Sequence, residues 1–431
     1  MRLYDTSSRE LQELPPPPGP VRMYFCGPTV YARAHVGNAR PFVIGMWLRS
    51  WLRSQGYDVN LVHNITDIND KIYDAAPGHS AELAAQATNW YLEDTGDLGL
   101  GQPDHVPKAT ETIPEIVSLI GELIEQGLAY PAGGDVYYRV SGFPDYGALS
   151  GRIDEESMRN PSEEPERSEL KEDPRDFALW KAHKEGEDTS WESPWGQGRP
   201  GWHVECSAMA EKFLGPAFEI HGGGLDLIFP HHENEVAQSR GAGREFEHAW
   251  MHNGMLQFVG EKMSKSLGNV VTLREAIDEW GRETLLVYFL GGHWRKPLDY
   301  SDDALNQAYA RTFTFRNAFI SETKPLPSSE WSRFEAALND DFNTPDALAI
   351  LHEWATTGQT ELLGRGLGVF GLESLSELPD PPEPIRRLAA ERQEARRAQD
   401  FERADRLRKE IEAFRWEVRD AGDEYTLVPR P

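Results

Sequence analysis

The hydrophobic pattern near the N-terminus predicts a strand, a helix and a second strand in that order. Residues 21–26 (VRMYFC) form a short apolar run, and apolar residues then recur every four positions from about 35 to 54, with Gly56 as a helix stop. Residues 57–65 alternate apolar and polar side chains. Parallel strands joined by a helix place a ligand crevice at their carboxyl ends. The segment that follows the first strand, CGPTVYARAHVGN, is expected at this crevice.

The later pattern predicts an interruption of this α/β unit, a second half of the sheet and a helical C-terminal region. An acidic stretch within the interruption is expected to be a solvated loop or an excursion, since it is rich in Glu, Asp, Pro and Ser. The ranges are 106–197 for the less regular insertion, 154–188 for its acidic stretch, about 198 for the resumption of the sheet, 302–319 and 345–372 for helical segments, and 378–384 for a proline-rich linker.

Composition narrows the class of protein. The chain has 431 residues, a formal net charge of -27 and only two cysteines. No apolar run is long enough to span a membrane, and the first residues have no signal-peptide pattern, so we expect a cytoplasmic protein without a membrane partner. The acidic balance argues against non-specific binding to nucleic acid, and any such partner must meet a local basic patch.

Two short motifs suit binding of a nucleotide. Gly37 allows close approach to the start of the predicted helix, where free N–H groups favour phosphate, and His35 and Asn38 can donate hydrogen bonds to phosphate oxygens. The sequence EKMSKSLGN at 261–269 follows an apparent strand at 254–259 and carries two lysines. Positioned ammonium groups can stabilise the negative charge that builds on a departing pyrophosphate. Each motif alone also fits an ordinary surface turn.

The cysteines leave three interpretations open: one disulfide bridge, two inert core thiols, or metal ligands. The sequence PHHENE at 230–235 favours the third, because His231 and Glu235 are four residues apart and share one face of a helix. Together with Cys26 and Cys206 they offer the donor types that zinc takes. The adjacent His232 points to another side of a regular helix, so the two histidines are not expected to bind one metal together. The order of these residues does not match the His-Glu-x-x-His pattern of zinc proteases.

The motifs together resemble those of one family. The blocks that carry the resemblance are CGPTVYARAHVGNAR (26–40), NITDINDKI (64–72), GRPGWHVECSAMA (198–210), IHGGGLDLIFPHHENEVAQS (220–239) and KMSKSLGN (262–269). In this combination and order they are similar to bacterial cysteinyl-tRNA synthetases, which are class I aminoacyl-tRNA synthetases. One departure is Asn38, where the wider class usually has a second histidine, although an amide can still donate to phosphate.

The resemblance implies a fold, a reaction and a set of site residues. The fold is a Rossmann-like α/β parallel-sheet catalytic domain with an insertion, followed by α-helical C-terminal domains. The reaction activates L-cysteine with ATP and Mg²⁺ to cysteinyl-adenylate, and then transfers cysteine to the 3'-terminal ribose of cysteine tRNA. The implied residues are Cys26, Cys206, His231 and Glu235 for one zinc ion, His35, Gly37, Asn38, Lys262, Ser264 and Lys265 for ATP and catalysis, and Thr66, Trp202 and His221 for the amino acid.

In this interpretation the zinc ion binds the sulfur of the substrate and so rejects serine. The expected domains are 1–300 for catalysis, 301–378 for a helical bundle and 385–431 for anticodon recognition, in a protein expected to be monomeric. The last of these contains a basic helical run at 386–409, which is unusual in so acidic a chain and suits tRNA. The helical region before this run is shorter than is usual in the family.

Two alternatives remain at this stage. A relative of these enzymes, the cysteine ligase of the mycothiol pathway, transfers activated cysteine to an amino-sugar amine and shares the zinc and lysine motifs. A non-catalytic paralogue that binds RNA is the second alternative. The sequences GNAR (37–40) and NITDINDKI and the basic C-terminal run favour tRNA as the acceptor over an amine, while intact HVGN and KMSKS motifs argue against a pure binding protein.

Overall fold

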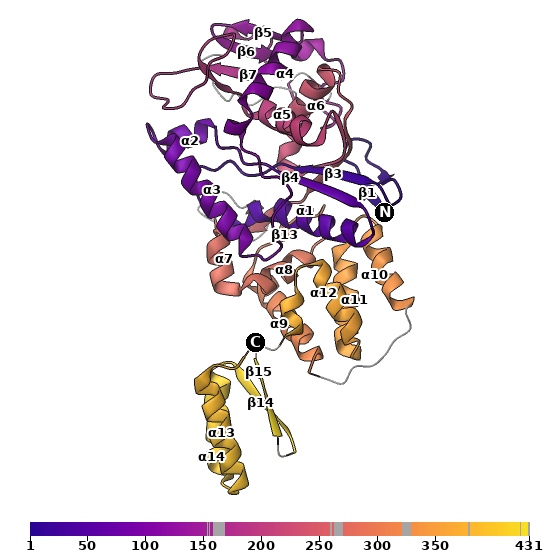
Figure 1. Ribbon diagram of the computed structural model, residues 1–431, viewed down its shortest axis with the longest axis vertical. Coiled ribbons are helices and arrows are strands. Elements are labelled where there is room, and N and C mark those ends of the chain that lie inside the picture. The colour runs from indigo at the N-terminus through magenta and orange to yellow at the C-terminus, as the bar shows by residue number, and fades with distance from the viewer. Residues whose placement is uncertain are drawn as a thin grey trace. The chain divides into compact units, whose positions relative to one another are not determined.

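A parallel sheet of four strands forms the centre of the N-terminal part of the computed structural model (Figure 1). Its strand order is β10–β9–β3–β4, and neighbouring strands are parallel throughout. The strands are β3 (Pro20–Phe25), β4 (Asp58–His63), β9 (Ala217–Gly224) and β10 (Phe246–Asn253). The first two come from the strand–helix–strand unit expected from the sequence, so the predicted α/β fold class with a parallel sheet is confirmed.

The structure describes residues 1–152, 154, 156–157, 169–258, 261–262, 270–320, 329–377, 380–422 and 424–429. The chain divides into two compact units. The first contains residues 1–279, 292–300 and 336–344, and the second contains 280–291, 301–335 and 345–431. None of the helices in the described ranges combines the length and the apolar character that crossing a bilayer requires.

Helices cover both faces of the sheet. Helix α1 (Val36–Ser54) and helix α5 (Trp202–Leu214) each contact β3, β4 and β9, and Figure 1 shows them on opposite sides of the strands. Because both faces are covered, the end of β3 is apolar on both sides, and α1 buries Trp47 and Trp51 completely. Gly56 follows α1 and ends the helical turn with a positive φ of 89°. The carboxyl ends of the four strands are left uncovered by this packing.

The insertion is more regular than the sequence indicates. It contains a helix and most of a second, antiparallel sheet with strand order β5–β6–β7–β8. Strand β7 (Phe177–Ala182) lies inside the acidic stretch that the composition assigns to a solvated loop, so that expectation is wrong for this part of it. The reason is that Phe177, Leu179 and Trp180 are buried in a core that the insertion shares with α5 and α6 (Glu233–Gly241), although charged residues surround them in the sequence.

The basic run near the C-terminus is two helices where the sequence suggests one. Helix α13 (Glu383–Arg397) ends before Gln399, which has a φ of 61°, and helix α14 (Phe401–Ala413) begins at the N-cap Asp400, whose side chain accepts a hydrogen bond from the backbone N–H of Arg403. A two-stranded sheet packs on this pair, and the small core they share contains Ile385, Ala389, Ile411, Trp416, Val418 and Leu427.

The remaining elements follow in chain order. In the first unit or at its borders they are β1 (Arg2–Tyr4), β2 (Leu11–Glu13), α2 (Asp70–Ala75), α3 (Ser80–Gly96), α4 (Ile113–Glu125), β5 (Ala129–Ala132), β6 (Asp135–Tyr138), β8 (Gly198–Pro200), α6 (Glu233–Gly241), β11 (Leu256–Phe258), β12 (Glu261–Lys262), α7 (Leu273–Trp280) and β13 (Leu298–Asp299). The others are α8 (Arg282–Leu290), α9 (Asp302–Ala318), α10 (Ser329–Asn339), α11 (Thr344–Thr357), α12 (Thr360–Val369), β14 (Trp416–Ala421) and β15 (Glu424–Pro429).

Candidate functional site

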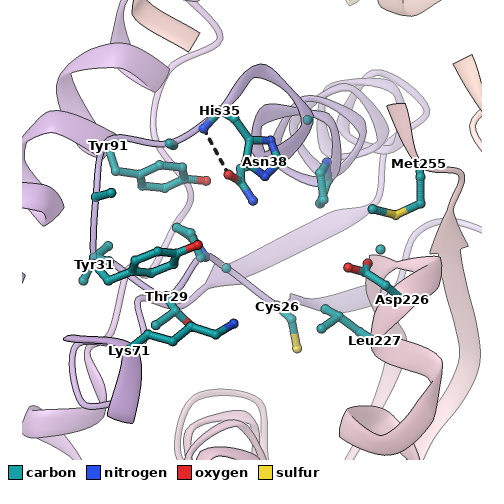
Figure 2. Close-up of a pocket in the computed structure, with 18 of the residues that line it drawn as sticks. Cys26, Thr29, Tyr31, His35, Asn38, Lys71, Tyr91, Asp226, Leu227 and Met255 are labelled. Carbon is teal, nitrogen blue, oxygen red and sulfur yellow. Dashed lines mark hydrogen bonds between the residues drawn. The ribbon is translucent and has the colours of Figure 1, made fainter. Parts of the chain in front are cut away.

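A pocket of about 390 Å³ lies at the carboxyl ends of the parallel strands (Figure 2). One wall is the segment between β3 and α1, which includes the HVGN motif. The other walls come from the starts of α2 and α5, from α3 and from the segments after β9 and β10. The lining residues from these other walls are Lys71, Tyr91, Trp202, Gly224, Asp226, Leu227, Asn253, Gly254 and Met255. The pocket therefore occupies the crevice at which the sequence pattern places its ligand.

Glycine is required where the chain leaves β3. A Cβ atom on Gly27 would lie 1.7 Å from the backbone oxygen of Asn64, so no other residue fits without moving the chain. The side chain of Asn64 accepts a hydrogen bond from the N–H of Gly27 at 2.9 Å. This close contact joins the ends of β3 and β4, and it holds Cys26 at the floor of the pocket.

The start of α1 presents His35, Gly37 and Asn38 to the pocket. The Asn38 Oδ1 atom accepts a hydrogen bond from the backbone N–H of His35 at 3.1 Å. Figure 2 shows that this bond turns the amide nitrogen of Asn38 away from the backbone and toward the cavity. A Cβ atom on Gly37 would lie 2.9 Å from Nδ1 of His35, so the glycine leaves room for that imidazole. This helix terminus has hydrogen-bond donors in position for an anion.

The chain after the lysine motif is attached to the same segment. The backbone N–H of Val36 donates to the oxygen of Val271 at 2.9 Å, and the N–H of Leu273 donates to Ala34 at 2.9 Å. Lys262 is in β12, which pairs with β11, whereas Ser264 and Lys265 lie outside the described residues. The backbone bonds thus hold the chain on the C-terminal side of the KMSKS motif against the HVGN segment.

The two cysteines meet at a buried cluster with His231 and Glu235. One donor atom from each of the four residues lies within 4.8 Å of every other. The Sγ atoms of Cys26 and Cys206 are 3.9 Å apart, Cys26 Sγ is 3.7 Å from Glu235 Oε1, and His231 Nε2 is 3.2 Å from the same oxygen. Both cysteines are free thiols, so the structure excludes the disulfide interpretation.

The chemistry of this cluster fits a divalent cation. Burial raises the pKa of the Cys26 thiol and of the Glu235 carboxyl well above their usual ranges, and the nearby Cys206 sulfur adds to the effect at both groups. The Oε2 atom of Glu235 accepts no hydrogen bond from the described residues, although it is fully buried. A cation held by these atoms would favour the thiolate and the carboxylate and would satisfy that oxygen.

A second set of donors, which the sequence does not indicate, overlaps the first. It consists of Cys26, His221, His232 and Glu235, again within 4.8 Å of one another. His221 Nε2 lies 3.5 Å from Cys26 Sγ, and His232 Nε2 lies 3.3 Å from the same sulfur. Burial lowers the pKa of both imidazoles well below the usual value, which keeps them neutral. Neither set contains both His231 and His232.

A hydrogen-bond chain orients the His232 ring. The hydroxyl of Thr6 donates to the carbonyl of Trp250 at 3.2 Å, so its oxygen accepts from His252 Nδ1 at 2.8 Å. His252 Nε2 then accepts from His232 Nδ1 at 2.7 Å, which leaves a lone pair on His232 Nε2 facing Cys26. His232 is therefore able to act as a metal ligand or as a hydrogen-bond acceptor at the cluster.

The chain makes an irregular turn immediately before α6. This turn covers Ile228–His232 and is kinked at Phe229, whose backbone is extended at φ -137° and ψ 132°. Glu233 fixes the start of α6 because its carboxylate accepts hydrogen bonds from the N–H groups of Gly147 at 2.9 Å and Ser150 at 2.8 Å. Helical spacing accounts for the approach of both histidines to Glu235, because His231 precedes it by four residues and His232 by three. Oε1 of Glu235 lies 3.2 Å from His231 Nε2 and 3.8 Å from His232 Nε2.

The three residues expected to bind the amino acid have different positions. Trp202 begins α5 and lines the pocket, and its ring centroid is 4.3 Å from that of His231. His221 is fully buried on β9 beside the cluster. Thr66 is buried where the chain after β4 pairs with Thr29, and Asn64 donates to its hydroxyl at 3.4 Å. Trp202 is thus the member of this group on the pocket wall.

Comparison with known proteins gives consistent results. Residues 14–310 match the family model of the tRNA synthetases class I (C) catalytic domain, and residues 333–359 match the DALR domain. The chain is 45% identical to the cysteine–tRNA ligase of Methylobacillus flagellatus over 96% of both chains. It is 44% identical to that of Halorhodospira halophila over 94% of both and 42% identical to that of Hydrogenovibrio crunogenus over 98% of both.

Solved structures share the fold at low sequence identity. A Mycobacterium tuberculosis methionyl-tRNA synthetase in complex with methionyl-adenylate matches with a TM-score of 0.60 and 15% identity, covering 83% of this chain and 89% of the other. The LeuRS of Agrobacterium radiobacter K84 matches with a TM-score of 0.58 and 11% identity, covering 84% and 86%. Because the catalytic-domain model spans most of the sequence and the relatives match over nearly their whole length, the chain belongs to the cysteine–tRNA ligase family of class I tRNA synthetases.

Proposed function

We infer that this protein is a cysteine–tRNA ligase that uses a zinc ion to select cysteine. Membership of the family gives the aminoacyl-tRNA ligase activity, with L-cysteine, ATP and cysteine tRNA as substrates. The observation that supports zinc selection is the buried cluster of two thiols, an imidazole and a carboxylate, whose Cys26 also lines the pocket. A core with a purely structural role would not need these four donor groups together, nor their position beside a substrate pocket.

In this proposal Cys26, Cys206, His231 and Glu235 hold the zinc ion. When bound, zinc supplies a position that prefers a thiolate to a hydroxyl, and this distinguishes cysteine from the nearly isosteric serine. Trp202 covers the side chain of the amino acid, since it lines the pocket and packs on His231. His221 and Thr66 support this end of the pocket from the buried side.

The nucleotide occupies the other end, at the start of α1. The backbone at Gly37, the imidazole of His35 and the amide of Asn38 bind the phosphates of ATP, which is bound with Mg²⁺ as the substrate. Lys262, Ser264 and Lys265 belong to the same function by their motif, and the lysines stabilise the departing pyrophosphate. The cysteine carboxylate attacks the α-phosphate, and the terminal ribose hydroxyl of the tRNA, the 2'-hydroxyl in this class, then attacks the activated carbonyl. Positioning and charge stabilisation account for the catalysis.

We further propose a division of labour along the chain. Residues 1–300, with the insertion at 106–197, carry out catalysis, residues 301–378 form a helical bundle, and residues 385–431 contact the anticodon. Helices α13 and α14 carry most of the arginines of this last part, which suits a nucleic-acid partner. We also propose that the protein is a monomer and that it acts in the cytoplasm, where tRNA is charged.

The experiment that tests the function measures attachment of labelled cysteine to cysteine tRNA, with an amino-sugar acceptor and with serine in parallel reactions. We expect charged tRNA with cysteine, no product with the amine, and exclusion of serine. Adenylate without charged tRNA would favour the amine ligase, and absence of adenylate would favour a non-catalytic paralogue.

Replacing Lys265 with alanine should lower cysteine-dependent pyrophosphate exchange by about 10²-fold, because one positioned charge at the pyrophosphate is lost. The zinc content of the variant should equal that of the wild type, since this lysine is no part of the thiol cluster. The rate of pyrophosphate exchange and the zinc content are measured on the same preparation. An unchanged exchange rate would remove Lys265 from the catalytic set.

A further inference from the structure

Among the described residues, the lining of the pocket includes two basic side chains. They are Arg33, from the segment between β3 and α1, and Lys71, from the first turn of α2. ATP and the carboxylate of an amino acid bring several negative charges into such a pocket. A basic side chain can stabilise them only if it is not already ion-paired with a carboxylate of the protein.

Arg33 is already paired. Its Nε atom donates to Asp94 Oδ2 at 2.9 Å and its Nη2 atom donates to Asp94 Oδ1 at 2.8 Å, and the Asp94 side chain is fully buried. This bidentate bond raises the pKa of Arg33 and compensates its charge. The geometry makes Arg33 a support of the pocket wall, fixed to α3.

Lys71 is placed differently. The adjacent Asp70 is turned away from the pocket, because its carboxylate pairs with Lys181, at 2.8 Å, and with Arg199. Among the described residues, no carboxylate lies within ion-pair distance of the Lys71 ammonium, which lies 5.7 Å from the ring centroid of Tyr31. Figure 2 shows the side chain entering the pocket from the wall opposite His35, with the ammonium directed into the cavity.

The backbone holds Lys71 in this position. The side chain of Asn69 caps α2 by accepting a hydrogen bond from the N–H of Lys71 at 3.1 Å, and Ile72 anchors the short helix in the core. The paired Asp70 fixes the same turn to the insertion. Lys71 is thus an exposed cation on a fixed turn, and the acidic residue next to it in the sequence does not neutralise it.

We propose that Lys71 binds the anionic junction between the two substrates, where the cysteine carboxylate attacks the α-phosphate. This assignment rests on the proposed function, which places the sulfur at the Cys26 cluster and the phosphates at the start of α1, so that the carboxylate and the α-phosphorus lie between the two. In the reaction a carboxylate oxygen bonds to the α-phosphorus while the bond from phosphorus to the bridging oxygen breaks, and pyrophosphate leaves with the electron pair. Lys71 transfers no proton and lowers the repulsion between the two reacting anions.

The test compares Lys71→Met with Lys71→Arg and with Lys108→Met in the full-length protein. Methionine keeps most of the length of lysine without its charge. Lys108 pairs with Glu111 at 3.3 Å on the surface and is no part of the pocket lining, so it is the matched control. The measurements are kcat and KM for cysteine-dependent pyrophosphate exchange, the zinc content, and single-turnover transfer from the isolated enzyme–adenylate complex to tRNA.

We expect Lys71→Met to lower kcat for exchange by about 10²-fold, with full zinc content and a smaller effect on transfer. Lys71→Arg should recover part of the loss and Lys108→Met should match the wild type. Exchange by Lys71→Met within twofold of Lys108→Met would overturn the assignment, and so would a defect confined to transfer, which would make Lys71 a tRNA contact. Failure of the wild-type protein to bind zinc or to activate cysteine would instead contradict the proposed function.

Discussion

Replacing Cys206 with serine is expected to remove the zinc ion and cysteine selectivity together. The Cys206 side chain is only 1% exposed, and its sulfur lies 3.9 Å from that of Cys26, which is the other cysteine of the chain, so no further thiol can take its place. A serine hydroxyl is a poor ligand for zinc where a thiolate is a good one. We expect zinc content to fall from one per chain to nearly none and cysteine-dependent exchange to fall by at least about 10²-fold, with weaker discrimination against serine.

The adjacent Ser207 provides a matched control on the same turn of α5. Its hydroxyl donates to Gln238 at 2.6 Å and takes no part in the donor cluster, so Ser207→Ala should retain zinc and show only a modest loss of stability. Thermal unfolding of both variants separates loss of the metal from loss of the fold. If Cys206→Ser kept a full complement of zinc, Cys206 would not be a ligand, and the overlapping set with His221 and His232 would be the better assignment.

The order of the central elements could be predicted because their patterns are local. Strand β3 starts within one residue of the predicted strand, and α1 starts one residue after the expected His35. The crevice follows from the parallel connection alone, since the carboxyl ends of neighbouring strands share one edge of the sheet. Cys26 and Asn38 could therefore be expected at the same pocket, without knowledge of any side-chain contact.

Other features are obscured by their surroundings or depend on contacts between distant segments. Strand β7 is a short apolar run, FALWKA, and the acidic composition of the residues around it hides this local signal. The orientation of the His232 ring depends on its hydrogen bond to His252 of β10, which does not follow from spacing. In the sequence Lys71 follows Asp70, which could neutralise its charge. The structure shows that Asp70 instead pairs with Lys181 and Arg199, more than a hundred residues away.

Asn38 provides the sharpest test of the nucleotide end of the site. Its side chain has two functions that the structure separates: the oxygen accepts the N–H of His35, while the amide nitrogen is directed into the pocket. Asn38→Asp keeps an oxygen for the first function and replaces the donor with a negative charge. An acidic residue in the first turn is favourable for the helix itself, so the fold should be retained.

We therefore expect Asn38→Asp to raise KM for ATP and to lower cysteine-dependent exchange by about 10²- to 10³-fold, because a donor to phosphate becomes a charge that repels it. Zinc content and thermal unfolding should match the wild type, since Asn38 is no part of the donor cluster. Asn38→His places a hydrogen-bond donor at this position but loses the hydrogen bond that Asn38 accepts from the N–H of His35. Its exchange activity should therefore lie between that of Asn38→Asp and that of the wild type. Activity of Asn38→Asp close to that of the wild type would show that the amide does not contact the phosphates, and the backbone at Gly37 would then account for ATP binding at this helix.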